Sequence, residues 1–199
     1  MIKLCVFDMG GVLVRDHQMG KELYPFLGIT ESGFAGIDVS LSDALRRHST
    51  GNLSEGEFWA LYKKLSGKDI PFHEGSLFGK FFHPKLDEPT VQVVTELKAH
   101  GMRVVAGTNV IDSHYKIHQK LNQYDVFALV YASHLIGIAK PDTTFYEHIL
   151  KAENLLASEV FFTDDSLENI EAASEIGIES FHYTDADTLR EKFISLGLL

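Results

Sequence analysis

The sequence predicts an α/β fold, in which a Rossmann-like parallel sheet of five strands has helices on both faces and carries an inserted α-helical subdomain. Three observations lead to this prediction. Short apolar, β-branched runs lack the alternation of half-buried strands, so they suit strands covered on both faces. Helical patterns separate the later runs, and such alternation is typical of parallel sheets with right-handed crossovers. A long stretch after the first run contains no convincing central strand.

Strands and helices alternate in the second half of the chain. A helix is expected at residues 90–100, where apolar residues recur at helical spacing and Gly101 suits the left-handed position just past the end. Further helices are expected at 143–153 and at 167–176, where Gly177 marks the end of the second. The five strands are expected at residues 3–7, 103–106, 128–131, 160–163 and 180–183.

The stretch from residue 15 to residue 87 predicts a helical subdomain inserted after the first strand. Ser54 and Glu57 have the spacing of a capping box, in which each residue caps the other at a helix start. The chain therefore divides into an α/β core domain, made of residues 1–14 and 88–199, and a helical subdomain of residues 15–87. The helices of this subdomain are expected at residues 20–27, 41–48 and 54–65.

The charge of the chain excludes some classes of partner. With 18 basic and 28 acidic residues among 199, its net charge is −10. An acidic protein lacks the electrostatic footprint for binding a nucleic acid or an anionic membrane. The single cysteine, Cys5, lies in an apolar run and is expected to be a buried structural thiol. Because no transmembrane run and no charged leader are evident, we expect a cytoplasmic protein.

Asp8 is the first candidate functional residue. It follows an apolar strand and precedes Gly10 and Gly11, which let a ligand approach the backbone. Sites in parallel α/β sheets form beyond the carboxyl ends of the strands, so a carboxylate here is well placed to attack a phosphorus atom. The alternative is an aspartate that only caps a turn.

Two other strand ends carry groups that suit a phosphate. Thr108 and Asn109 follow the second strand, where a hydroxyl and backbone N–H groups at a helix start form an anion site. Lys140 precedes Pro141, which keeps the lysine extended and aims its ammonium group at the strand ends. The alternatives are an ordinary helix start for the Thr-Asn pair and a solvated surface position for the lysine.

An acidic pair, Asp164 and Asp165, ends the fourth strand. Adjacent carboxylates repel each other unless a cation or a helix N-terminus offsets their charge. Hard oxygen ligands of this kind suit Mg²⁺, which keeps several of its waters. The alternative is a pair that caps the following helix.

In combination, these residues resemble the motifs of the haloacid dehalogenase-like superfamily, and the resemblance covers essentially the whole chain. Asp8 matches the nucleophile, Thr108 the hydroxyl, Lys140 the lysine, and Asp164 and Asp165 the acidic fourth motif. The predicted helical insertion resembles the type-1 cap of that family. The resemblance implies a Mg²⁺-dependent phosphomonoester hydrolase that acts on a small phosphorylated metabolite.

The resemblance also implies a role for each site residue. Asp8 would form an aspartyl-phosphate, which water would then hydrolyse. Thr108 and the Asn109 backbone N–H would hold phosphate oxygens, and Lys140 would pair with Asp8 and the phosphoryl group. The metal would be held by Asp8, the Gly10 carbonyl, Asp165 and, directly or through water, Asp164.

Gly10 departs from the family pattern. Phosphatases of this family usually carry a second aspartate there, which protonates the leaving group and later activates water. Such acid–base help is worth about 10²–10⁴-fold in rate. Three explanations stay open: a substrate with a better leaving group, a replacement residue such as Asp16 or His17, or a chain that no longer turns over substrate.

A further resemblance favours the first explanation. A subgroup with glycine at this position resembles sugar-1-phosphate phosphatases, whose anomeric leaving oxygen is better than that of an ordinary alcohol. Residues 49–65 also resemble the cap of that subgroup, so a hexose 1-phosphate is the expected type of substrate.

Two other functions remain as alternatives. A non-catalytic phosphate- or metal-binding protein would explain Gly10 simply, but it would have no need of the other motif residues. A dehalogenase is disfavoured, because that branch has an aromatic residue at the Gly10 position and uses an arginine, for which Arg15 is the only near candidate.

Overall fold

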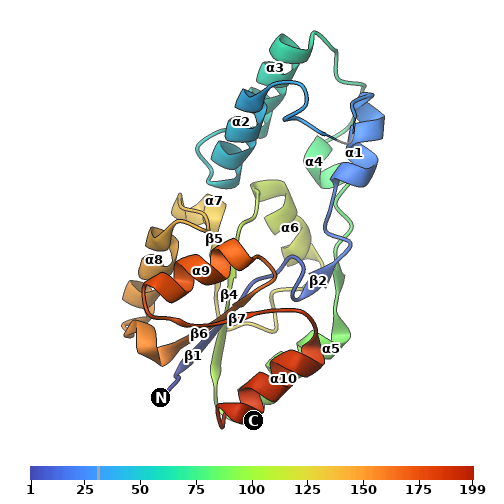
Figure 1. Cartoon of the computed structure of the whole chain (residues 1–199). Coiled ribbons are helices and arrows are strands. Elements are labelled where there is room, and N and C mark those ends of the chain that lie inside the picture. Colours follow the sequence, from blue (N-terminus) through green and yellow to red (C-terminus); the bar gives the residue numbers. More distant parts are fainter. Residues whose placement is uncertain (31) are drawn as a thin grey trace.

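Figure 1 shows a computed structural model of the chain, which describes residues 1–30 and 32–199. Five parallel strands form one sheet in the order β5-β4-β1-β6-β7, which confirms the predicted fold class. The order reverses at β1, and in such sheets the carboxyl ends at the reversal form a ligand crevice. The strands are β1 (Leu4–Phe7), β4 (Arg103–Thr108), β5 (Val130–Ala132), β6 (Val160–Asp164) and β7 (Glu179–His182).

Helices cover both faces of the sheet, and β1 shows why its sequence lacks alternation. Cys5 and Phe7 pack on one face, whereas Leu4 and Val6 pack on the other, and all four are buried. Because both faces are covered, successive residues must all be apolar. On the first face lie α5 (Glu88–Ala99) and α10 (Ala186–Ser195), and on the second lie α8 (Thr143–Glu153) and α9 (Leu167–Glu175).

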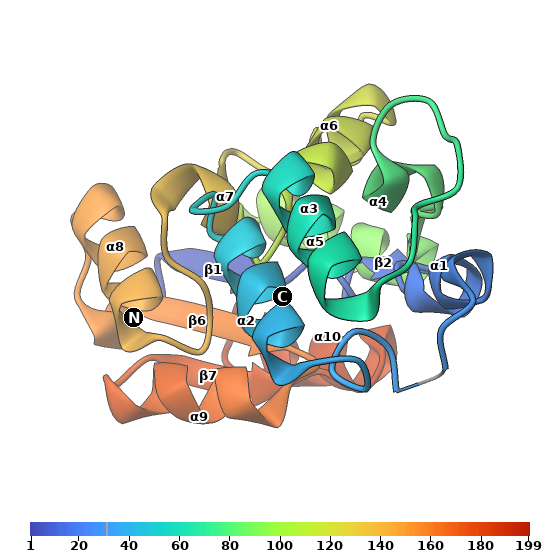
Figure 2. The ribbon, with the colours of Figure 1, turned by 90° about the horizontal axis from the view of Figure 1, so that it is seen from above.

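A separate group of helices lies beyond the carboxyl end of the sheet, as seen from above in Figure 2. They are α1 (Gly20–Leu27), α2 (Val39–Ser49), α3 (Glu55–Ser66) and α4 (Leu77–Lys80). These helices enclose a core of their own, in which aromatic rings meet edge-on around Phe34. The predicted capping box is present, with Ser54 and Glu57 each capping the other at the start of α3. A hydrogen bond from Ser133 Oγ to the Ser49 carbonyl, 2.5 Å long, joins α2 to the sheet domain.

Two short strands connect the helical group to the sheet domain. β2 (Val14–Arg15) pairs antiparallel with β3 (Lys85–Leu86), and the Asp87 N–H donates to the Leu13 carbonyl at 2.9 Å. The sequence did not predict this ribbon, because two-residue strands have no recognisable periodicity. The predicted boundaries at residues 14/15 and 87/88 lie at this ribbon, and the division of the chain there stays a prediction.

Several short or weakly patterned helices were not predicted. They include α4, α6 (Asp112–Lys120), α7 (Ser133–Ile136) and α10. Of these, α6 is mostly polar along its length, and the four-residue helices are too short to show a period. In the part of the chain that the structure describes, every helix is too short or too polar to cross a membrane.

Candidate active site

The side chains predicted for the site converge at the carboxyl ends of three neighbouring strands. Asp8 directly follows β1, Thr108 ends β4 and Asp164 ends β6, and β1 pairs with both of the other strands. All three side chains are buried. Parallel pairing therefore brings together residues that are up to 156 positions apart in the sequence, as expected for a strand-order reversal.

Lys140 lies between two of these carboxylates. Its Nζ is 2.7 Å from Asp8 Oδ1 and 2.5 Å from Asp164 Oδ2, and its side chain is only 1% exposed. Burial acts to lower the pKa of Lys140, but the two carboxylates outweigh burial and raise it. The lysine is therefore a buried, fixed ammonium group rather than the solvated surface lysine considered from sequence.

Asn109 holds the backbone of Lys140 in place. Its amide nitrogen donates to the Lys140 carbonyl at 2.8 Å, and its Oδ1 accepts from the Lys140 N–H at 2.9 Å. This reciprocal pair fixes the lysine backbone across 31 residues of sequence. The sequence singled out Asn109 for its backbone N–H, and the clamp made by its side chain was not predicted.

Three carboxylates form a cluster of oxygen donors. Asp8, Asp164 and Asp165 each offer one oxygen, and these oxygens lie within 4.8 Å of one another. Burial raises the pKa of Asp8 to about 7, with a further contribution from Asp164, although Lys140 opposes the rise. Burial and Asp164 also raise the pKa of Asp165. One lysine does not balance three carboxylates, so this hard-oxygen cluster fits a divalent cation such as Mg²⁺.

The two members of the acidic pair have different surroundings. Asp164 accepts hydrogen bonds from the Ser166 N–H at 2.9 Å and from Asn169 Nδ2 at 3.0 Å, in addition to Lys140. The carboxylate of Asp165 accepts no hydrogen bond from the side chain of another described residue, and it is more exposed. Asn169 was missed in the sequence analysis, although its position in the first turn of α9 could have suggested this contact.

Gly11 is required by the position of Asp165. A Cβ atom built on Gly11 would lie 2.1 Å from Asp165 Oδ2, and its φ of +83° favours glycine. The glycine thus lets the Asp165 carboxylate approach the backbone of the loop that follows Asp8. At Gly10, a Cβ atom would instead meet the ring of His17, 3.2 Å from its Cδ2.

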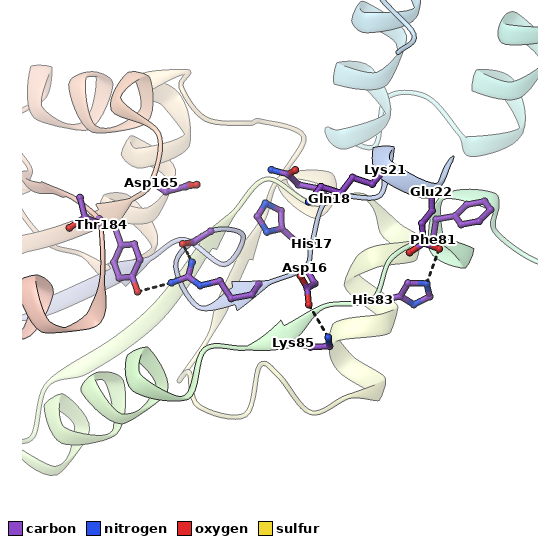
Figure 3. Close-up of a pocket in the computed structure, with 13 residues that line it drawn as sticks. Asp16, His17, Gln18, Lys21, Glu22, Phe81, His83, Lys85, Asp165 and Thr184 are labelled. Carbon is purple, nitrogen blue, oxygen red and sulfur yellow. Dashed lines mark hydrogen bonds and ion pairs between the residues drawn. The ribbon is translucent and has the colours of Figure 1, made fainter. Parts of the chain in front are cut away.

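A cleft of about 740 Å³ opens beside Asp165, and Figure 3 shows its walls. Asp165 and Thr184 lie at one end, His17 lies in the middle, and residues of α1 and of the segment before β3 lie at the other end. Most of the lining side chains are polar or charged. They include Arg15, Asp16, His17, Gln18, Lys21, Glu22, His83, Lys85 and Asp165.

Arg15 is engaged in the framework of this cleft. Its guanidinium donates to the Gly11 carbonyl, to Asp87 Oδ1 at 3.2 Å and to the Tyr183 hydroxyl at 2.9 Å. The Tyr183 hydroxyl in turn lies 2.6 Å from Thr90 Oγ1. Arg15 therefore ties the loop after β1 to the β2–β3 ribbon and to the loop after β7.

Comparisons with known proteins agree with this geometry. A model of the family described as haloacid dehalogenase-like hydrolase matches residues 2–177. A sesquiterpene phosphatase of Aspergillus oryzae is 30% identical, with 92% of this chain and 91% of the relative covered. A D-ribitol-5-phosphate phosphatase of Bacteroides thetaiotaomicron is 26% identical, with 91% of each chain covered. A solved enzyme of the same family from Bacteroides thetaiotaomicron, in complex with magnesium and inorganic phosphate, has a TM-score of 0.71 at 22% identity, covering 92% of this chain and 95% of that one.

Proposed function

The chain belongs to the haloacid dehalogenase-like hydrolases, and within that family we propose that it hydrolyses phosphomonoesters through an aspartyl-phosphate at Asp8. The observation that carries this proposal is the buried contact of Lys140 with both Asp8 and Asp164. A fixed cation beside a carboxylate at a strand end is what attack on a phosphoryl group requires. Two relatives that match more than nine tenths of the chain are named as phosphatases, which supports the same reaction class.

The positions of the protein groups support the following roles. Asp8 attacks the phosphorus, and Lys140 holds Asp8 in place and offsets the charge of the phosphoryl oxygens. Thr108, which is buried at the end of β4, and the Asn109 backbone N–H bind those oxygens. Asn109 also keeps Lys140 in position through its side-chain clamp. Water then attacks the phosphorus and releases phosphate from Asp8.

Mg²⁺ is the cofactor of this site. Asp8, the Gly10 carbonyl and Asp165 would hold it, while Asp164, whose oxygens already accept three hydrogen bonds, contributes directly or through water. When bound, the ion neutralises the clustered carboxylates and the phosphoryl oxygens, so that nucleophile and substrate no longer repel each other.

The substrate that suits the cleft is a small, hydroxyl-rich phosphate, such as a hexose 1-phosphate or another sugar phosphate. The cleft beside Asp165 is lined by Arg15, Lys21, Glu22 and Lys85, whose charges would lose their hydration against an apolar chain. Hydroxyl groups would instead pair with them. The polar lining thus favours a substrate of the polyol or sugar type over a terpenyl phosphate.

The helical subdomain, residues 15–87, acts as the cap that closes over the cleft, and residues 1–14 and 88–199 form the catalytic core. Closure of such a cap excludes water from the reaction. The net charge of −10 speaks against a nucleic-acid or membrane partner. A cytoplasmic location stays a prediction of the sequence.

Two alternatives make different predictions. A phosphate- or metal-binding protein without turnover is favoured only by Gly10, which lacks the usual acid. A dehalogenase would need a free arginine beside Asp8, whereas Arg15 is bound to Gly11, Asp87 and Tyr183. The site therefore suits phosphate ester hydrolysis better than either alternative.

The test is a phosphate-release screen with Mg²⁺ across sugar phosphates, polyol phosphates, nucleotides and a terpenyl phosphate. We expect release from at least one sugar or polyol phosphate, and none from the same protein carrying Asp8→Asn. Phosphate release that is unaffected by Asp8→Asn would contradict the mechanism. Stable phosphorylation of Asp8 without release would favour the binding protein instead.

A further inference from the structure

The ring of His17 occupies the space into which a side chain at position 10 would project. A Cβ atom built on Gly10 would lie 3.2 Å from His17 Cδ2 and 3.4 Å from His17 Nε2. The space beside Gly10, two residues after Asp8, is therefore filled by the ring of His17. The side chain in this space is an imidazole, a group that can donate or accept a proton.

His17 also lines the cleft, and no side chain or backbone group of a described residue forms a hydrogen bond with its ring. Its ring lies in the middle of the cleft, between Asp165 and the residues of α1 (Figure 3). Nδ1 is buried and has no hydrogen-bond partner among the described residues. A buried ring nitrogen without a hydrogen-bond partner costs free energy. This cost is offset if substrate or water becomes the partner of the ring.

Asp16, the other candidate replacement, is placed differently. Its carboxylate is 61% exposed and forms an ion pair with Lys85 Nζ at 2.9 Å. Figure 3 shows this pair below His17, with the Asp16 side chain directed toward Lys85. The hydrogen bond and charge of Lys85 also lower the pKa of Asp16, which favours the ionised form held by this ion pair.

We infer that His17 is a catalytic residue that takes the place of the missing aspartate and serves the leaving group. This inference rests on the proposed phosphohydrolase function. With His17 as the proton donor, the enzyme does not need a substrate with an unusually good leaving group. It would therefore also accept phosphates of ordinary alcohols, such as polyol phosphates.

The proton balance of the reaction is as follows. As the bond between Asp8 and phosphorus forms, the bond between phosphorus and the leaving oxygen breaks, and that oxygen takes the electron pair and a proton from protonated His17. In the second step, water attacks the phosphorus and gives its proton to the neutral imidazole. The bond to Asp8 breaks, and both Asp8 and His17 return to their starting states.

The test compares two substrates that differ in their need for a proton. The leaving oxygen of glycerol phosphate needs protonation, whereas that of p-nitrophenyl phosphate is stable without it. For His17→Ala, we expect the first-turnover rate of alcohol release, measured by rapid quench, to fall by about 10²-fold or more on glycerol phosphate and by at most a few-fold on p-nitrophenyl phosphate. Only the first turnover separates the substrates, because the second step needs His17 with either one. A first-turnover burst of p-nitrophenol near the wild-type rate also shows that the variant is folded. His100→Ala, which removes an exposed histidine, is the matched control and should change neither rate.

A second variant tests whether positions 10 and 17 share one place. Gly10→Asp in the His17→Ala background should raise the rate on glycerol phosphate at least tenfold above that of His17→Ala alone. In the wild-type background, the same substitution should give no gain, because the ring fills the space. Equal first-turnover losses on both substrates, no loss in His17→Ala, or a selective first-turnover loss in Asp16→Asn instead would each overturn the inference. In each of these cases the wild-type protein still has its Asp8-dependent phosphatase activity. A wild-type protein that hydrolyses neither substrate would instead refute the proposed function itself.

Discussion

Lys140 Nζ lies 2.7 Å from Asp8 Oδ1, and both side chains are almost fully removed from solvent. The same ammonium group contacts Asp164, so one cation serves two carboxylates that stand at neighbouring strand ends. Burial alone would favour the neutral forms of Lys140 and Asp8, and their mutual contact offsets part of that cost. The catalytic geometry and the local stability of the site therefore depend on the same contacts.

Replacing Lys140 by methionine should affect both properties. The change leaves two buried carboxylates without their cation, and breaking a buried pair in this way typically costs about 3–5 kcal/mol. Proton uptake by Asp8, whose pKa is already about 7, would reduce that cost. We expect phosphate release to fall by at least about 10²-fold. Activity assays and urea unfolding measure the two effects.

The control for this change is Lys116→Met, which removes an exposed ion pair with Asp112. Pairs of that kind contribute about 0–1 kcal/mol, so neither activity nor stability should change much. If both lysine variants behave alike, Lys140 has no special role.

Mg²⁺ should stabilise the folded protein as well as activate it. A ligand that binds only the native state stabilises it by about 2.7 kcal/mol at a hundred times its Kd, so Tm should rise with Mg²⁺ concentration. EDTA should abolish phosphate release. In Asp165→Asn the rise in Tm should shrink or vanish, whereas Asp112→Asn, on the surface, should keep it. A rise in Tm of normal size in Asp165→Asn would argue against Asp165 as a ligand.

Gly11→Ala should impair metal binding more than folding alone explains. The new methyl group would meet Asp165 Oδ2, and the backbone has a φ of +83°. Gly67→Ala is a matched control, because its φ is +67° but, apart from its two chain neighbours, no described residue has an atom within 4 Å of the added Cβ. Both variants should lose about 1–2 kcal/mol from backbone strain. Only Gly11→Ala should lose the Mg²⁺-dependent rise in Tm and the activity, and equal effects in both would contradict the proposed contact.

The buried side chain of His114 leads us to expect that the folded protein becomes less stable in acid. Its ring stacks on Phe82 with centroids 3.7 Å apart, and burial lowers its pKa to about 4 from the usual 6.5. As the pH falls, His114 takes up a proton in the unfolded chain before it does so in the folded protein. The stabilising contribution of neutral, buried His114 is therefore complete above pH 6.5 and is lost as the pH falls toward 4. At about 1.4 kcal/mol per pKa unit, the loss is about 3 kcal/mol by pH 4.

Urea unfolding at pH 7.0, 5.5 and 4.5 measures this dependence. His114→Gln should flatten the decline relative to the wild type, whereas His100→Gln, at an exposed position, should leave it unchanged. A wild-type and His114→Gln pair with parallel pH profiles would show that His114 does not cause the loss.

Local patterns were sufficient to predict much of this molecule. The run before Asp8 is buried on both faces, as its uninterrupted apolar character indicated, and α8 and α1 have the predicted bounds. Helix α3 begins with its predicted capping box. Polar residues directly after buried strands identified the candidate site, because parallel strands place their carboxyl ends at one edge.

Contacts between distant segments could not be predicted in this way. The clamp of Asn109 on Lys140 spans 31 residues, and the β2–β3 ribbon joins segments about 70 residues apart. The place of His17 beside Gly10 depends on how the loop after β1 turns back through hydrogen bonds to the Met9 carbonyl. The sequence by itself determined which strands form and which chemical groups follow them, because the apolar pattern of a strand and the capping of a helix are properties of neighbouring residues. Only the tertiary structure decided which side chains share one site, because that depends on the packing of segments that are far apart in the chain.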